Sequence, residues 1–354
     1  MDNKMMKYCG SIQQMIYARP VTYREGRAEQ MNAVEAKCGD IFFHSALDKA
    51  LDISDFSYKG MNMTFLAKPG LEGRNHYDTN GEEALRSIMG GLFFTCGLEN
   101  ICAPCTIDGK DYPMHGRMRT TPAEHVGTDV VREGDTYRLI ITGEMREAEL
   151  FGENMVLRRR IESVLGENSI TVTDEVENQA FRPEPLMLLY HCNLGYPFLD
   201  ENCQLYVPSK GVTGREEFSQ QYVEEWDRMK APVDNECEYV YIHDMQSDEN
   251  LDTMILAANH ALNIGLTIEF NQKNLPYFME WKSLASGDYV LGLEPSNSSV
   301  YGKTYHVEND TVHYLKPFEK ETNVLKFSVI EGKEMIEEAI NKINKIKEQK
   351  NEKI

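Results

Sequence analysis

The sequence has no long apolar segment and comparatively little positive charge. No hydrophobic run reaches the roughly 18 residues that a membrane-spanning helix needs. Residues 1–18 are too polar to contain the apolar centre of a signal peptide. The chain has 37 lysines and arginines against 57 aspartates and glutamates, a net charge of −20, which disfavours binding to nucleic acid or to anionic membranes. We therefore expect a cytoplasmic protein with neither nucleic-acid nor membrane partners.

Cysteine is also scarce. Eight cysteines in 354 residues are too few for a disulfide framework, and without an export signal we expect reduced thiols. Cys96, Cys102 and Cys105 lie in the segment GGLFFTCGLENICAPC, which precedes His115 by ten residues. A zinc site and a thiol nucleophile are alternatives here, but no second tight cysteine pair is near, and Cys96 follows an apolar run typical of a buried strand. We expect these cysteines to pack rather than to react.

Strand patterns dominate the middle of the chain. Apolar and polar residues alternate in SITVTDEVEN, residues 169–178, and in IGLTIEF, residues 264–270. Residues 136–143 and 154–163 are rich in β-branched or apolar residues. A period of two with turn residues between the segments predicts antiparallel sheet with one buried face. No series of strands alternating with long helices is present, which disfavours a doubly wound α/β fold.

Helix patterns are few. Short helices are expected over residues 82–89 and 215–229. The clearest helical stripe is C-terminal and consists of Met335, Ile336, Ala339, Ile340, Ile343 and Ile346. We expect an amphipathic helix within residues 331–354 that docks on the sheet, with a partner-binding role as the alternative. Residues 1–330 show no break in composition, and so they are expected to form one large β-sandwich domain.

Two ionisable residues lie near the ends of apolar strand segments. His191 follows PLMLLY, with Asn193 close behind it, and Glu294 follows YVLGL directly before a proline. A glutamate sheltered by apolar neighbours has a raised pKa and can act as a base near neutral pH, where histidine already titrates. Each residue alone is more often structural than catalytic. A catalytic interpretation therefore depends on the two acting together.

Three segments, in this order, resemble the aldose 1-epimerase (galactose mutarotase-like) superfamily, and most closely its branch described as DUF4432. They are GGLFFTCGLEN with the later HGRMR, then YHCNLGYPFLD, then WKSLASGDYVLGLEPSN. Residues 49–60, KALDISDFSYKG, also resemble the N-terminal part of this branch, and the resemblance covers most of residues 20–300. It implies a mainly β fold, a large antiparallel β-supersandwich with a few short helices and a C-terminal helix, which binds sugar in an open cleft on one sheet.

The resemblance also implies roles for individual residues. Glu294 matches the general base of the family and His191 its general acid. Expected contacts with the substrate come from His115, Arg119, Arg117, Arg86, Asn193, Tyr190 and Trp281. The guanidinium of Arg119 is expected near the charge that develops on the anomeric oxygen, and Trp281 either stacks on a sugar face or lies in the core. Lys282 is expected to be solvated.

The sequence departs from the relatives at one position, and one further residue of the relatives has only a candidate match. Met89 stands where the hexose-6-phosphate branch carries an arginine, and so a sugar phosphate is not the expected substrate. Asp244 is the candidate for an acidic residue that galactose mutarotases place near the site.

We therefore expect an aldose 1-epimerase, or mutarotase, that acts on a monosaccharide or sugar derivative without a metal or cofactor, as a monomer or homodimer. One alternative is another sugar isomerase, epimerase or lyase on the same scaffold, which would have to stabilise an enolate. The other is a non-catalytic carbohydrate-binding protein, which has no need of His191 and Glu294 together.

Overall fold

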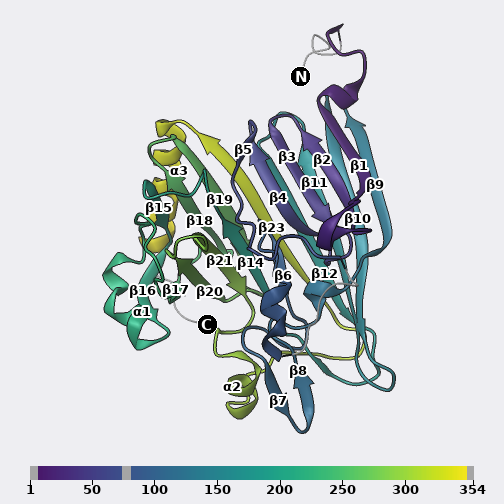
Figure 1. Ribbon diagram of the computed structural model, residues 1–354, viewed down its shortest axis with the longest axis vertical. Helices are drawn as coiled ribbons and strands as arrows, with labels where there is room; N and C mark the ends of the chain where they lie inside the picture. Colours follow the sequence, from purple (N-terminus) through teal and green to yellow (C-terminus); the bar gives the residue numbers. More distant parts are fainter. Residues whose placement is uncertain (1–6, 74–80, 349–354) are drawn as a thin grey trace.

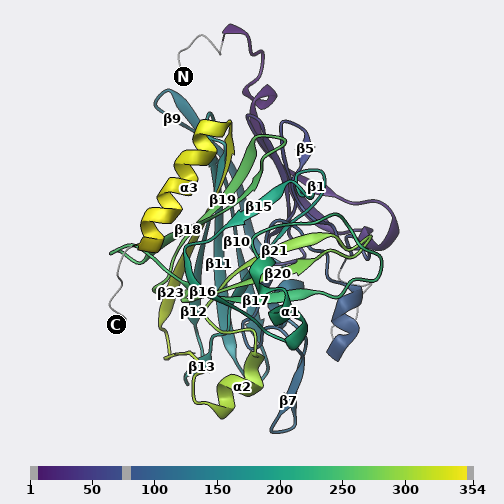
Figure 2. The ribbon, with the colours of Figure 1, turned by 90° about the vertical axis from the view of Figure 1, so that its left-hand side faces the viewer.

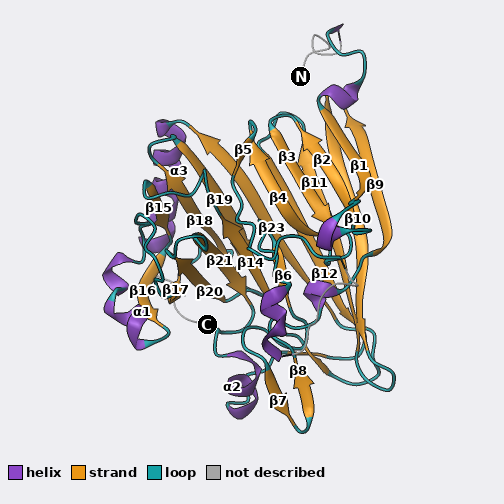
Figure 3. Ribbon diagram, viewed as in Figure 1, coloured by secondary structure: helices purple, strands orange, loops and turns teal. Residues whose placement is uncertain are grey.

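The computed structural model describes residues 7–73 and 81–348 and consists mainly of antiparallel strands (Figure 1, Figure 3). The largest sheet has eight strands in the order β15-β18-β19-β23-β12-β11-β10-β9. Their bounds are β9 Glu124–Glu133, β10 Thr136–Ala148, β11 Asn154–Val164, β12 Ser169–Asn178, β15 Cys203–Tyr206, β18 Asp252–Asn259, β19 Ile264–Asn271 and β23 Lys320–Glu331. All four strands expected from the sequence in this region are present, as β10, β11, β12 and β19.

Two smaller sheets face the large one. The first runs in chain order and comprises β1 Ile16–Thr22, β2 Asn32–Cys38, β3 Ile41–Ala46, β4 Asp52–Tyr58 and β5 Met61–Asn62. The second has the order β16-β17-β20-β21-β14-β6, with bounds β6 Phe94–Cys96, β14 Leu189–Leu194, β16 Ser209–Gly214, β17 Tyr239–Met245, β20 Tyr277–Ser283 and β21 Val290–Ser296. Short ribbons pair β7 Cys105–Ile107 with β8 Lys110–Tyr112, and β13 Glu184–Pro185 with β22 Tyr314–Leu315.

The main apolar core lies between the eight-stranded sheet and the two smaller sheets. It combines Ile161 and Val172 of the large sheet with Phe43 of the five-stranded sheet and Leu293 of the six-stranded sheet. Strand β12 shows why the sequence favours this packing, since its apolar residues alternate with partly exposed polar ones along its length. Burial of the apolar face is the driving force that pairs the sheets.

A buried arginine connects all three sheets. Arg159 of β11 lies 2.7 Å from carboxylate oxygens of Asp174 in β12 and Asp52 in β4. It also donates to Oγ1 of Thr95 in β6, at 2.8 Å. Because the guanidinium and both carboxylates are buried but mutually hydrogen-bonded, the charges are tolerated inside the core.

The helices are short except for the last one. Their bounds are α1 Glu217–Gln221, α2 Gly302–Glu308 and α3 Lys333–Glu348, with 3₁₀ turns η2 Ile12–Gln14, η3 Gly26–Ala28, η5 Gly81–Arg86, η6 Met118–Thr120 and η7 Val223–Glu225. The helix expected over 82–89 is therefore a 3₁₀ segment, and the one expected over 215–229 is split into α1 and η7. None of the helices in the described part of the chain is both long and apolar enough to cross a membrane.

Helix α3 lies on the outer side of the eight-stranded sheet, away from β20 and β21 (Figure 2). Its Ile336 and Ile343 pack against Met254 and Leu256 of β18, which confirms the predicted docking stripe. Met335 is an exception because it is 47% exposed. Residues 349–354 of the predicted helix lie outside the described residues.

Candidate functional site

A large cavity lies on the face of the six-stranded sheet that points away from the core. Its volume is about 1120 Å³. Residues of β6, β14, β17, β20 and β21 form its floor, and segments 65–69 and 82–90 contribute to its walls. Lining residues that matter for the chemistry are Phe94, His115, His191, Asn193, Arg215, Glu238, Trp281 and Glu294.

Strand alternation decides which predicted residues reach this cavity. In β14, His191 and Asn193 line the cavity, whereas Tyr190 is fully buried on the opposite face. The Tyr190 hydroxyl donates to Oδ2 of Asp174 at 3.0 Å. The expected contact of Tyr190 with substrate is therefore wrong, since neighbouring side chains of a strand point to opposite faces.

The same rule separates Trp281 from Lys282 in β20. Trp281 lines the cavity. Lys282 points to the other face, is 2% exposed, and donates to the backbone oxygens of residues 225, 226 and 228. The expectation that Lys282 is solvated is wrong, because its ammonium group has three carbonyl acceptors inside the protein.

The predicted acid and base meet on the cavity floor. Nε2 of His191 lies 3.1 Å from Oε1 of Glu294, and the two side chains are only 12% and 7% exposed. Burial raises the pKa of Glu294 to about 8, although Arg215 lowers it and Glu238 raises it further. Burial also lowers the pKa of His191 to about 4, partly offset by Asn193. Burial thus favours the uncharged forms, in which the pair holds a single proton near neutral pH.

Gly292 makes this contact possible. It lies two residues before Glu294 on the same face of β21, between His191 and Trp281. A β-carbon at position 292 would come within 2.9 Å of Cε1 of His191 and 3.3 Å of Oε1 of Glu294. Any larger residue would push the two groups apart, and so the glycine of the GLEP motif provides the space in which they meet.

His115 reaches the cavity from a tight turn. Its φ is +57°, and that of the following Gly116 is +71°. A β-carbon at Gly116 would lie 2.2 Å from the carbonyl oxygen of Gly97, so this position requires glycine. The His115 ring is 5.9 Å from the His191 ring and perpendicular to Phe94. Burial, followed by the charges of His191 and Arg119, lowers the pKa of His115 to about 3, which keeps the imidazole neutral.

Two imidazole nitrogens at this site have no hydrogen-bond partner among the described residues. They are Nδ1 of His115 and Nδ1 of His191, and both are buried. Buried polar atoms are nearly always hydrogen-bonded in folded proteins. The two rings line the cavity, but these nitrogens themselves are buried, so a ligand would reach them only after a local rearrangement.

Sequence reasoning missed Arg215 and Glu238. Glu238 accepts a hydrogen bond from Nε1 of Trp281 at 2.8 Å, and its other oxygen lies 3.4 Å from Nη2 of Arg215. This fixes the edge of the indole beside His191, whose ring centre is 5.3 Å away. Asp244, the predicted acidic residue, is exposed and is not part of the cavity wall. The one sequence signal for Glu238 is its position directly before strand β17.

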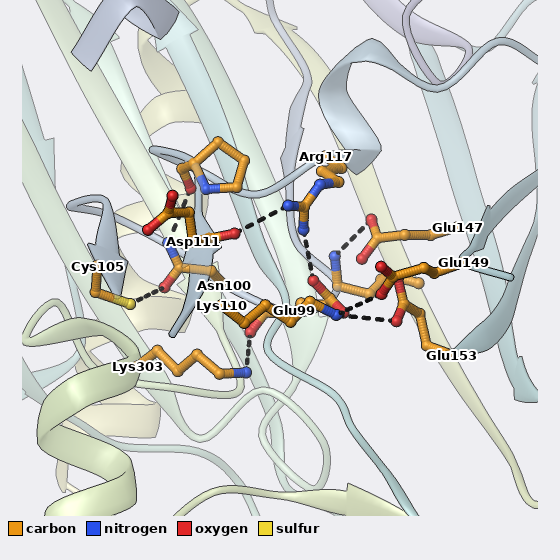
Figure 4. Close-up of polar contacts among 12 residues, drawn as sticks. Glu99, Asn100, Cys105, Lys110, Asp111, Arg117, Glu147, Glu149, Glu153 and Lys303 are labelled. Carbon is orange, nitrogen blue, oxygen red and sulfur yellow. Dashed lines mark hydrogen bonds and ion pairs between the residues drawn. The ribbon is translucent and has the colours of Figure 1, made fainter. Parts of the chain in front are cut away.

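The three arginines that were predicted to contact substrate lie in different environments. Arg86 lies on the cavity wall, largely exposed and paired with Glu83 at 3.2 Å. Arg117 turns away from the cavity to Glu99, at 2.6 Å, within a cluster of carboxylates around Lys110 (Figure 4). Its proposed contact with substrate is not supported by this position, because Glu99 and the backbone oxygen of Asp111 occupy its donors.

Arg119 lies beneath the cavity rather than in its wall. It is fully buried and donates from Nη1 to Oγ of Ser87 at 3.1 Å. Its charge contributes to the low pKa of His115. Arg119 thus influences the site through His115, and its expected contact with substrate is not supported, because it is fully buried and does not line the cavity.

Of the three cysteines expected to pack, Cys96 is fully buried, whereas Cys102 and Cys105 are partly exposed. Cys96 is buried, and burial raises the pKa of its thiol well above the usual range. Cys102 lines the cavity, but burial raises the pKa of its thiol to about 12, which disfavours a thiolate nucleophile. Within residues 7–73 and 81–348, no three histidine, cysteine, aspartate or glutamate side chains gather closely enough to hold a metal ion.

Comparison with known proteins places the chain in a family. The profile of the family described as "Domain of unknown function (DUF4432)" matches residues 28–329. No curated protein sequence matches the chain.

Several solved structures share the fold. A protein of Klebsiella pneumoniae, provisionally named an aldose 1-epimerase, superposes with a TM-score of 0.88 at 22% identity, over 96% of this chain and 93% of that one. A galactose mutarotase-like protein of Clostridium acetobutylicum gives 0.64 at 14% identity, over 90% and 100%. A galactose 1-epimerase of Lactobacillus acidophilus gives 0.55 at 12% identity, over 90% and 99%. These similarities confirm the predicted β-supersandwich fold.

Proposed function

The chain belongs to the DUF4432 family, and we propose that it is an aldose 1-epimerase that interconverts the anomers of a sugar bound in the cavity. The observation that carries the proposal is the buried contact between His191 and Glu294 at 3.1 Å on the cavity floor. The shared fold with proteins named aldose or galactose 1-epimerases supports it.

The proposed reaction needs one proton acceptor and one proton donor. The acceptor removes the proton of the anomeric hydroxyl, the donor protonates the ring oxygen, and the ring opens. Rotation about the C1–C2 bond and the reverse steps then give the other anomer. Because both oxygens are bonded to the same carbon, an acceptor and a donor that lie close together can reach them at once.

A pair that holds one proton supplies both functions. With Glu294 ionised and His191 protonated, the glutamate is the base and the histidine the acid, as the resemblance implies. With the proton on Glu294, which burial favours, the roles are exchanged. Since mutarotation proceeds in both directions, either arrangement contains the required donor and acceptor.

Neighbouring residues position the sugar in this proposal. The neutral His115 lines the cavity and offers its imidazole to a ring hydroxyl, or to the oxygen on which charge develops. Trp281, held by Glu238, presents an apolar ring to the C–H face of a pyranose. Asn193 donates to the backbone oxygens of Gly91 and His191, and so it fixes the strand that carries the acid-base pair.

Anomer exchange of freshly dissolved sugars tests the proposal directly. Polarimetry or NMR exchange spectroscopy is expected to show that the wild-type protein accelerates the equilibration of at least one common aldose. His191→Ala and Glu294→Gln should each remove most of this acceleration. If the wild type accelerates no aldose or uronate, the proposed activity is wrong, and tight sugar binding without acceleration would indicate a carbohydrate-binding protein.

A further inference from the structure

We infer that the cavity has an outer subsite and that the substrate is an uncharged saccharide longer than one unit, with its reducing end at His191 and Glu294. This inference rests on the proposed function and specifies its substrate. Three observations carry it: the extent of the cavity, the position of an ion pair at its outer end, and the pairing of the cations in its walls.

The cavity is larger than a single sugar ring requires. Pockets of about 300–1,000 Å³ enclose ligands of drug size, and a monosaccharide is smaller than most of these. The cavity of about 1120 Å³ exceeds that range. The groups proposed for chemistry occupy only the floor formed by β6, β14, β20 and β21, so that much of the volume is left for other parts of a substrate.

An ion pair marks the outer end. Nζ of Lys68 lies 2.5 Å from Oδ2 of Asp288, and both residues line the cavity. Asp288 precedes β21 by two residues and Gly292 by four, which at about 3.3 Å per residue spans up to roughly 13 Å. At this upper limit, the separation of Asp288 from Gly292 exceeds the length of one pyranose ring, and Asp288 lies outside the strand that carries Glu294. The ammonium and carboxylate of the pair offer a donor and an acceptor to the hydroxyls of a second ring.

The charges in the walls favour an uncharged ligand. Within the described residues, four cationic side chains line the cavity, and each is paired with a carboxylate: Arg27 with Glu72, Lys68 with Asp288, Arg86 with Glu83, and Arg215 with Glu238. Glu82 also lines the cavity and adds a further negative charge. A phosphate or carboxylate group on the sugar would have to compete for cations that are already neutralised. A neutral polyhydroxylated ligand can instead use both partners of each pair.

Apolar surface accompanies these pairs. Phe65, Pro69, Leu85 and Ile88 line the same outer walls. Sugar rings have apolar C–H faces beside their hydroxyls, and so they bind surfaces in which apolar patches and polar groups alternate. The outer walls therefore match a second sugar ring better than they match a charged group.

Substrate preference provides the test. Rates of anomer exchange are measured for glucose, glucose 6-phosphate and the reducing disaccharides maltose, cellobiose and lactose. We expect kcat/KM for at least one disaccharide to exceed that for glucose about tenfold, and that for glucose 6-phosphate to fall below it. If no disaccharide is preferred over glucose, or if glucose 6-phosphate is the best substrate, the inference is wrong.

The Lys68→Met variant links the preference to the outer subsite. Lys68 is exposed, and exposed ion pairs contribute little to stability, so that the fold should be retained. The disaccharide-to-glucose ratio of kcat/KM should fall about tenfold in Lys68→Met. Lys342→Met, which removes the Lys342–Glu269 pair on α3, is the matched control and should keep the wild-type ratio. An unchanged ratio in Lys68→Met would overturn the inference.

Calorimetry separates this inference from the proposed function. Glu294→Gln is titrated with the same disaccharides and with glucose. One possible result is that the variant binds a disaccharide about tenfold more tightly than glucose while the wild type accelerates no sugar. This result would support the subsite and contradict the epimerase proposal. Acceleration of glucose by the wild type, with equal binding of glucose and disaccharides, would retain the epimerase proposal and overturn the subsite.

Discussion

The two faces of strand β14 hold ionisable groups under opposite conditions. On the core face, Tyr190 donates to Asp174, which is paired with the fully buried Arg159. On the cavity face, His191 and Glu294 lie 3.1 Å apart, with the pKa of each displaced toward its uncharged form. Residues 190 and 191 are neighbours in the chain, yet they belong to different networks.

The difference lies in how completely each network is satisfied. The guanidinium of Arg159 donates to Asp174, Asp52, Thr95 and a backbone oxygen, so that its charge is compensated in every direction. On the cavity face, Nδ1 of both His115 and His191 is buried without a hydrogen bond from the described residues. Burial raises the pKa of Asp52 in the core network to about 6 as well, so displaced pKa values do not separate the two networks. Complete hydrogen bonding is typical of a structural role, whereas unsatisfied buried atoms call for a further explanation, such as a bound ligand.

The largest effect is expected from removing one member of the cavity pair. Glu294→Gln keeps the shape of the side chain but cannot exchange a proton, and so the acceleration of anomer exchange should fall about 10²- to 10⁴-fold. The free energy of unfolding should change by less than about 1 kcal/mol, because no fully compensated charge is lost. Polarimetry and urea denaturation measure the two quantities. A large loss of stability with intact activity would reverse the roles assigned to the two faces.

The core network should respond in the opposite way. Arg159→Met leaves Asp174 and Asp52 buried without their cation, and the free energy of unfolding should fall by about 3–5 kcal/mol. Arg158→Met is the matched control, because the neighbouring Arg158 is partly exposed and pairs with Glu144 and Glu177, which are also partly exposed. Its cost should be about 0–1 kcal/mol. Equal losses of unfolding free energy in the two variants would show that burial does not determine how much the network contributes to stability.

The pH dependence of activity should reflect the shared proton of the cavity pair. Below about pH 4 both His191 and Glu294 are protonated and no base remains, whereas above about pH 8 both are deprotonated and no acid remains. The acceleration should therefore be greatest between these values and fall about tenfold per pH unit outside them. Rates corrected for the uncatalysed reaction provide the profile. Full activity well above pH 8 would contradict a role for a protonated Glu294.

The smallest effect is expected for Tyr190→Phe. The hydroxyl contributes one hydrogen bond to Asp174, whose other contacts with Arg159 remain, and so the free energy of unfolding should fall by about 1 kcal/mol. Activity should stay within twofold of the wild type, since the hydroxyl points into the core. Thermal unfolding and anomer exchange test this pair of outcomes. A tenfold loss of kcat would show that the two faces of β14 are coupled.

The sequence was informative where a local pattern determines structure. The period-two alternation predicted β12 and β19, and the apolar runs before His191 and Glu294 indicated these two residues as candidates. Their expected position near strand ends is wrong, because both lie within strands, in β14 and β21. Strand alternation could also have excluded Tyr190, because Tyr190 and His191 are adjacent and cannot both face the cavity.

The remaining features depend on contacts between distant segments. Arg215 and Glu238 reach Trp281 only after β16, β17 and β20 pair side by side. Arg117 and Arg119 lie in one five-residue motif with His115, but the neighbours supplied by Glu99 and Ser87 hold them away from the cavity. No spacing rule within the motif predicts these partners, because they come from other parts of the chain.

The floor and the walls of the cavity come from separate stretches of the chain. The acid-base pair lies on β14 and β21 of the six-stranded sheet. The Arg159 network connects this sheet, through Thr95, to the eight-stranded and five-stranded sheets. Residues 65–69 and 82–88, by contrast, contribute outer wall surface. Substitutions in these wall segments can alter which saccharide is selected while the proton-transferring pair keeps its geometry. Such a division would let proteins that descend from one ancestral chain change their saccharide specificity while retaining the same chemistry.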